Sequence, residues 1–234
     1  MYKELKERVC RANIALKENG LVALTWGNVS ECDRERKIFA IKPSGVPYDV
    51  LKPEDIVIVN FDGDVVEGDL NPSSDAPTHA ELYRRFPSIG GVTHTHSRYA
   101  TAWAQAGRSI PAYGTTHADF AHGEVPCTRP LTAEEINGDY ELETGRVIAD
   151  LFESSGLEPL HVPAVLVSSH GPFTWGKNGW NSMENAIILE EVGNMALQTE
   201  LLSGGKTNSA PSVLLDKHFM RKHGPNAYYG QKKK

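Results

Sequence analysis

The stretch Gly90-Gly91-Val92-Thr93-His94-Thr95-His96-Ser97 combines a predicted strand with a pair of histidines. Two glycines mark a turn, and the residues after them predict a strand that runs through His96. Because side chains alternate along a strand, His94 and His96 are expected on the same face. Two neutral imidazoles side by side can chelate a divalent metal, although a bare pair of this kind is more often structural.

Outward from this strand, the chain mixes predicted helices with short apolar strands. Hydrophobic spacing and the positions of Gly and Pro predict helices at residues 2–19, 77–86, 98–106, 139–153, 182–202 and 211–224. Further strands are predicted at residues 38–41, 56–59, 65–66 and 164–168. The order does not follow strict strand–helix–strand alternation, and no linker or repeat divides it. We expect one α/β or α+β domain over residues 1–234, with residues 232–234 as a disordered basic tail.

Composition excludes several classes of protein. The chain has 234 residues, a net charge of −6 and 40% hydrophobic residues, which is typical of a globular protein. An acidic chain is a poor nucleic-acid binder, and no apolar run approaches the roughly 20 residues that a bilayer requires. The N-terminus lacks a secretory core, and the three cysteines are scattered. These features indicate a cytoplasmic protein that binds neither nucleic acid nor membrane.

Two further segments offer metal ligands. His170 lies between an apolar strand and Gly171-Pro172, where a strand end would present its imidazole. Asp75 lies in a turn-rich loop and would add a carboxylate. Three histidines with an open position are typical of a catalytic zinc site. Sequence spacing leaves open whether these distant segments meet.

Three short loops suit a phosphate group. They are Trp26-Gly27-Asn28, Lys42-Pro43-Ser44-Gly45 and Ser73-Ser74. Backbone N–H groups near glycine, together with Ser, Asn and Lys side chains, bind anions well. None of the loops matches a nucleotide-binding motif, and each alone is usually just a turn. Their occurrence beside a metal candidate predicts a small phosphorylated substrate.

Acid–base candidates are fewer. Asp119, at the end of the polar segment Thr115-Thr116-His117-Ala118-Asp119, is either a helix cap or a general acid/base near a metal. Tyr228-Tyr229 near the C-terminus is suited to packing, to an interface or, with a perturbed pKa, to acid catalysis.

Together these segments resemble the class II aldolase/adducin-like family, and in particular its epimerase branch acting on L-ribulose 5-phosphate. The resemblance covers nearly the whole chain. Its long, ordered motifs are residues 24–30, 41–46, 72–75, 94–97, 114–119, 169–173 and 221–224. It implies a three-layer α/β/α fold with a central, largely antiparallel sheet, and a homotetramer with active sites between subunits.

The resemblance also implies roles for individual residues. A divalent metal, usually Zn2+ with Mn2+ or Co2+ as alternatives, would bind His94, His96 and His170, with Asp75 at the site. Asp119 and Tyr229 would be the acid/base pair, the tyrosine coming from an adjacent subunit with His218 near it. The substrate and its phosphate would contact Gly27, Asn28, Lys42, Ser44, Gly45, Ser73, Ser74 and Thr115.

The implied reaction interconverts L-ribulose 5-phosphate and D-xylulose 5-phosphate in arabinose and pentose catabolism. Cleavage of C3–C4 followed by re-addition to the opposite aldehyde face would invert C4. The nearest alternative is a sugar-phosphate aldolase of the L-fuculose-1-phosphate type, whose members carry Glu at the position matched by Asp75. A non-catalytic adducin-like module is a remote alternative, since it predicts loss of the metal histidines.

Overall fold

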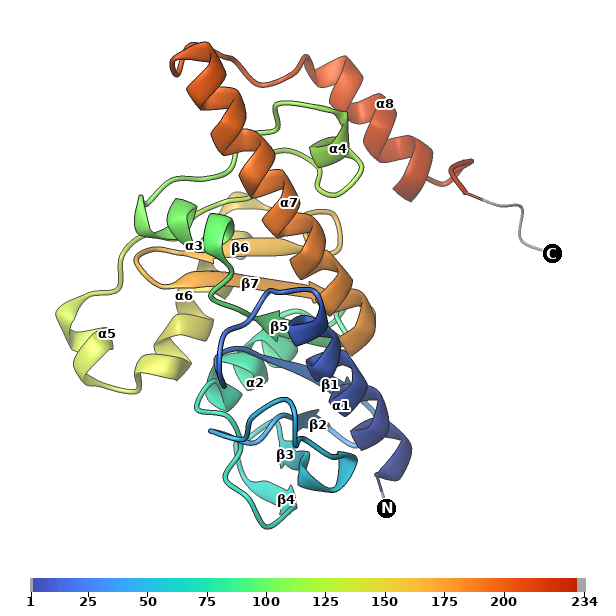
Figure 1. Ribbon diagram of the computed structural model, residues 1–234, viewed down its shortest axis with the longest axis vertical. Helices are drawn as coiled ribbons and strands as arrows, with labels where there is room; N and C mark the ends of the chain where they lie inside the picture. The colour runs from blue at the N-terminus through green and yellow to red at the C-terminus, as the bar shows by residue number, and fades with distance from the viewer. Residues whose placement is uncertain (1, 231–234) are drawn as a thin grey trace.

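The computed structural model describes residues 2–230, so the predicted basic tail lies outside the described residues. Seven strands form one sheet in the order β4-β3-β2-β1-β5-β7-β6 (Figure 1). Each neighbouring pair is antiparallel, which confirms the expected sheet. The strands are β1 (Asn28–Asp33), β2 (Ile38–Ile41), β3 (Val57–Asn60), β4 (Val65–Glu67), β5 (Gly91–His94), β6 (Ala164–Val167) and β7 (Gly171–Gly176).

Helices cover both faces of the sheet, which makes the three layers of the predicted α/β/α fold (Figure 1). Helices α2 and α6 pack on one face, and α1 and α7 pack on the other. Within residues 2–230, no helix is long and apolar enough to cross a membrane. The helices are α1 (Lys3–Glu18), α2 (Ala76–Arg85), α3 (Arg98–Gln105), α4 (Thr115–Ala118), α5 (Ala133–Asn137), α6 (Tyr140–Ser155), α7 (Gly179–Ser203) and α8 (Ser212–His223).

Strands β2 and β6 are apolar and buried on both sides because both of their faces are covered. In β2, Phe39 and Ile41 join the core under α2 and α6, whereas Ile38 and Ala40 join the core under α1. This alternation follows from the two-residue repeat of a strand. The apolar runs at residues 38–41 and 57–59 are therefore buried strands, as predicted, whereas the predicted strand at residues 65–66 is the exposed edge strand β4.

Two strands inside the sheet, β1 and β7, are not among the predicted elements. In β1 the polar side chains are buried and paired: Ser30 Oγ lies 2.6 Å from His79 Nδ1, and Glu31 pairs with Arg8. β7 begins with Gly171-Pro172, a dipeptide that usually signals a turn. Because β1 carries polar side chains and β7 begins with Gly-Pro, neither strand shows the apolar pattern by which the other strands are predicted.

The strand that carries the histidine pair is shorter than predicted. β5 ends at His94, and His96 lies in the turn that leads to α3, so the prediction that the strand runs through His96 was wrong. The ladder with β7 pairs His94 with Phe173, and beyond it only a long bond from Thr95 N to Pro172 O (3.4 Å) remains. The two imidazoles therefore converge through the turn and not through strand alternation.

Candidate active site

Three histidines meet at one end of the central strands. His94 Nε2 and His96 Nε2 lie 3.1 Å apart, and one nitrogen from each of His94, His96 and His170 falls within 4.8 Å of the others. His170 lies in the turn between β6 and β7, and the pairing of β7 with β5 places this turn beside His94. The antiparallel ladder thus brings together His94 and His170, which are 76 positions apart in the sequence.

The chemistry of this cluster fits a divalent cation. His94 Nδ1 lies 3.0 Å from Pro172 O and donates to it, which leaves the Nε2 lone pair free for a ligand. Burial, and then the neighbouring histidines, lower the pKa of His170 to about 4 and also lower the pKa of His96. Near neutral pH these rings are therefore uncharged and offer lone pairs, as a metal requires.

Asp75 borders the same cluster, at the N-terminus of α2. Its Oδ2 accepts a hydrogen bond from Asn28 Nδ2 at 2.6 Å and a longer one from Ser73 Oγ at 3.4 Å. Burial alone would raise the pKa of Asp75, but nearby His94 and then His79, together with the Asn28 amide, outweigh it and lower that pKa. Asp75 is therefore a carboxylate fixed in place, and Asn28 is itself fixed opposite His94 in the β1–β5 ladder.

A pocket of about 390 Å³ opens over the histidines. The three loops predicted to bind phosphate form its other wall, so the structure unites the metal and phosphate candidates. Of the predicted residues, those that line it are Gly27, Asn28, Lys42, Ser44, Gly45, Ser73, Ser74, Asp75, His94, His96 and His170. Gly27 has φ +78°, and a Cβ there would lie 2.9 Å from His94 O, so only glycine lets this loop pack so closely.

Lys42 is a buried cation without a carboxylate partner among residues 2–230. Its Nζ donates to Pro43 O at 3.2 Å and lies 4.8 Å from the centre of the Tyr48 ring. Burial lowers the pKa of Lys42 to about 8. A buried ammonium with so few partners, at the wall of a polar pocket, is suited to an anionic ligand.

Sequence reasoning gave no role to several residues of this pocket. Tyr140 and Glu141 also line it, and Tyr140 Oη lies 3.3 Å from His170 Nδ1. Trp26 belongs to a loop predicted to bind phosphate, but nothing in the sequence placed its ring beside the histidines, where it is centred 6.2 Å from that of His96. Tyr140 and Glu141 fall in the first turn of α6, where nothing in the hydrophobic pattern distinguishes them from ordinary helix residues.

The expected acid/base residues form a separate cluster between α4 and α8. Asp119 accepts from Arg221 Nη2 at 2.6 Å and lies 3.1 Å from His218 Nδ1, and His223 Nε2 donates to its backbone oxygen at 2.9 Å. Burial alone would raise the pKa of Asp119, but Arg221 and then His218 lower it below its usual range. Arg221, which had no predicted role, is thus the main partner of this carboxylate.

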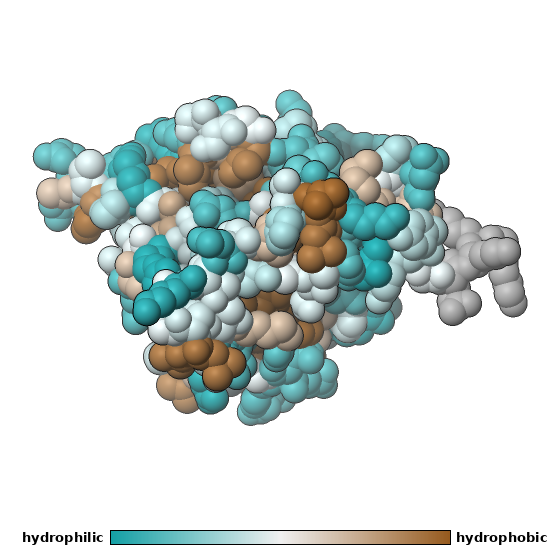
Figure 2. All heavy atoms as spheres, turned by 90° about the horizontal axis from the view of Figure 1, so that it is seen from above, coloured by the Kyte–Doolittle hydropathy of each residue, from teal (hydrophilic) through white to brown (hydrophobic). Residues whose placement is uncertain are grey.

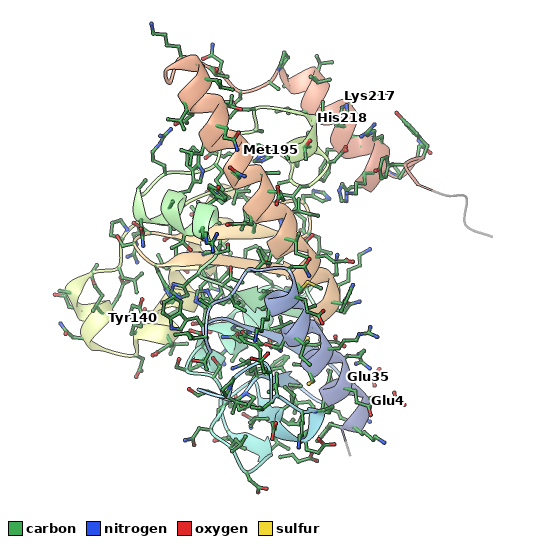
Figure 3. The ribbon with its side chains drawn as sticks, in the orientation of Figure 1. Glu4, Glu35, Tyr140, Met195, Lys217 and His218 are labelled. Atoms are coloured by element: carbon green, nitrogen blue, oxygen red, sulfur yellow. The ribbon has the colours of Figure 1, made fainter. Side chains whose placement is uncertain are left out.

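Thr115 and Tyr229 also lie outside the metal pocket of their own chain. Thr115 opens α4, one short helix before Asp119, and Tyr229 is 61% exposed with its ring 5.1 Å from the Arg221 guanidinium. In Figure 3, His218 on α8 lies far from Tyr140, which lines the pocket. One chain alone therefore does not bring the four residues Thr115, Asp119, His218 and Tyr229 to the histidines.

The other histidines have structural partners. His79 is buried against Ser30, and His117 Nε2 lies 2.7 Å from Gly123 O. The rings of His122, His161 and His223 surround Phe219, the buried residue of α8. A larger hollow of about 650 Å³, beside Asp119 along α7, contains none of the histidine triad.

Comparison with known proteins shows that several solved structures share this fold. The structure matches an L-fuculose 1-phosphate aldolase with TM-score 0.74 and 25% identity, over 93% of this chain and 95% of that one. The L-fuculose-1-phosphate aldolase of Thermus thermophilus matches with TM-score 0.65 and 24% identity, over 87% and 98% of the two chains. A putative aldolase/epimerase/decarboxylase from Klebsiella pneumoniae matches with TM-score 0.68 and 22% identity, over 93% and 98%.

The family model for the class II aldolase and adducin N-terminal domain matches residues 7–197. This range includes all seven strands, the histidine triad and the phosphate loops. It stops before α8, which carries His218 and Arg221. Because this match covers well over half of the chain, the chain belongs to the class II aldolase and adducin family.

Proposed function

We propose that this chain, acting as one domain, is a cytoplasmic L-ribulose-5-phosphate 4-epimerase. The observation that carries the proposal is the state of Asp75. Asn28 holds this carboxylate at 2.6 Å, and the lowered pKa keeps it ionised. An ionised, fixed carboxylate is a poor proton donor, so a carbanion formed beside it survives to attack the aldehyde again.

The reaction route follows from the acidity of the substrate. The C4 proton of L-ribulose 5-phosphate is not adjacent to the C2 carbonyl, so its direct removal is slow. Removing the proton of the C4 hydroxyl instead breaks C3–C4 and gives glycolaldehyde phosphate and the enediolate of dihydroxyacetone. After the aldehyde turns over, attack on its other face reforms C3–C4 with C4 inverted, and the new C4 oxygen takes up a proton.

The residues of the pocket divide this work. A divalent metal such as zinc, when held by His94, His96 and His170 beside Asp75, supplies positive charge next to the ketose oxygens. Lys42 and the backbone of the loops at residues 27–28, 44–45 and 73–74 bind the phosphate. Phosphate contacts keep the aldehyde fragment in the pocket while it rotates, which makes recombination faster than escape.

Proton transfer at C4 needs a group on each face of the aldehyde. We assign these roles to Asp119 and Tyr229, with His218 and Thr115 beside them. Since these residues lie outside the pocket of their own chain, they would act in the pocket of a neighbouring copy within a homotetramer. Exposed apolar residues on α7 and α8, including Met195, Leu202 and Val213, support such a contact. Figure 2 shows apolar patches on this end of the molecule.

The alternative is a sugar-phosphate aldolase that releases its two fragments. The similarity to an L-fuculose 1-phosphate aldolase favours it. An aldolase must protonate the three-carbon fragment before release, and the ionised state of Asp75 argues against that step.

The two activities are separated by incubating the metal-loaded protein with L-ribulose 5-phosphate in deuterium oxide. The epimerase forms D-xylulose 5-phosphate with no deuterium at C4, because the C4–H bond is never broken. Accumulation of dihydroxyacetone and glycolaldehyde phosphate would indicate the aldolase. Deuterium at C4 would exclude the cleavage route.

A further inference from the structure

Tyr48 connects two of the loops that line the phosphate end of the pocket. Its side chain is 3% exposed, and its hydroxyl lies 2.8 Å from Trp26 O and 2.7 Å from Gly27 O. A phenol has one proton, so this donor is shared between two consecutive carbonyls. Both belong to the loop whose glycine packs against His94, and the bond restrains the direction of the following N–H groups.

The ring of Tyr48 faces the second loop. Lys42 Nζ lies 4.8 Å from the ring centre, within the range of a cation–π interaction. The other partner of the ammonium is Pro43 O at 3.2 Å. The ring thus provides a favourable surface for a charge that no carboxylate neutralises among the described residues, without competing for it as a carboxylate would.

We propose that Tyr48 is a positioning residue for the phosphate group of the substrate: its hydroxyl fixes the Trp26-Gly27 loop and its ring holds the Lys42 ammonium in the pocket. This inference rests on the proposed function, because it assumes that the anion bound here is the substrate phosphate. It adds a residue that touches neither the histidine triad nor the phosphate.

The protonation of Tyr48 supports this role. Burial, and then the charge of Asp75, raise the pKa of Tyr48, so the phenol keeps its proton and remains a donor at all pH values at which Lys42 is charged. The hydrogen bonds of Tyr48 go to loop carbonyls and not to the histidines. Its loss should therefore change phosphate affinity and KM more than kcat.

The test measures binding of inorganic phosphate by calorimetry to the metal-loaded protein and to four variants, two at Tyr48 and one each at Tyr83 and Lys42. Tyr48→Phe removes only the hydroxyl, and we expect it to weaken phosphate binding about threefold to tenfold, with a matching rise in KM and kcat within about twofold. Tyr48→Leu also removes the ring and should weaken binding about threefold further. Bound metal should stay at the wild-type level in both.

Tyr83→Phe is the matched control, since it deletes another buried phenol hydroxyl, 2.7 Å from Ser30 Oγ, without touching the phosphate loops. It should bind phosphate as the wild type does, so a loss shared with it would mean general destabilisation and overturn the inference. Wild-type binding by Tyr48→Phe, with binding lost in Lys42→Met, would also overturn it. Wild-type binding by Lys42→Met would instead refute the phosphate site itself.

Should Tyr48→Phe prove insoluble, Tyr48→Leu alone decides the role of the ring. Wild-type phosphate affinity in that variant contradicts the inference, whereas weakened affinity with full metal content supports it. If both variants bound phosphate equally weakly, the ring would have no role in holding Lys42, and only the hydroxyl would position the loop.

Discussion

The metal pocket and the α8 cluster are built in contrasting ways. The pocket is made from loops at the ends of central strands, and His94, Asn28 and Lys42 are each at most 2% exposed. The α8 cluster rests on an ion pair between Asp119 and Arg221, whose side chains are 20% and 25% exposed, and α8 buries Phe219 alone among its described residues. Under the proposed function, the buried region holds the groups that bind metal and phosphate, and the more exposed region holds the groups that transfer protons.

This difference suggests that neither region is an active site by itself. Substitutions in the pocket should change metal or phosphate binding, whereas substitutions in the α8 cluster should change turnover and leave both kinds of binding intact. The experiments below would sharpen this division or break it.

The largest effect is expected from His96→Asn. Removing one of three imidazoles should abolish stoichiometric metal binding and lower activity by more than about 10³-fold together, because the remaining pair binds metal weakly. Metal content by atomic absorption and turnover on the same sample check this. His161→Asn, at a ring that packs on Phe219, is the control and should keep its metal. Full activity in metal-free His96→Asn would refute the site.

In the α8 cluster, Asp119→Asn and Tyr229→Phe should each lower kcat by about 10²-fold to 10⁴-fold, as expected for loss of a general acid or base. Circular dichroism, bound metal and phosphate affinity should remain those of the wild type. If either variant turned over at the wild-type rate, its assignment would be wrong. If either lost metal, the division between the two regions would fail.

Asp75→Glu tests why the fragments recombine. A longer carboxylate reaches further than one held at 2.6 Å from Asn28, and once protonated it would donate to the three-carbon fragment. We expect dihydroxyacetone and glycolaldehyde phosphate to accumulate while epimerisation falls about tenfold or more. Product analysis by NMR checks this, with Asp75→Asn as the control that cannot serve as an acid. Unchanged products in Asp75→Glu would argue that Asp75 does not govern release.

A smaller effect concerns Lys42. Since its pKa is lowered to about 8, the ammonium is charged below that pH and neutral above it. KM for the phosphorylated substrate should therefore rise as pH increases through 8, by at most about tenfold per pH unit, because one proton is involved. Steady-state kinetics between pH 7 and about 9 check this. In Lys42→Met, KM should be about tenfold or more higher, and its rise near pH 8 should disappear.

The sequence predicted the apolar strands and the long helices well, because periodicity reports burial directly. It missed β1, whose Ser30 and Glu31 are buried with partners that only the fold supplies. It also identified the phosphate-loop candidates, because Gly27 and Lys42 lie in short loops rich in Gly, Ser and Asn, and the structure brings these loops together. It could not place Asp119 relative to the histidines, because that separation depends on how α4 and α8 pack against the rest of the fold, which no local pattern reports.

The central claim is that pocket and α8 cluster work across subunits, and mixing two inactive variants tests it most directly. His96→Asn keeps a sound α8 cluster, and Tyr229→Phe keeps a sound pocket. After dissociation together and reassembly at equal amounts, about a quarter of the sites should pair a sound pocket with a sound neighbour and recover that share of wild-type activity. Each variant reassembled alone should stay inactive. A mixture as inactive as its components would contradict the claim.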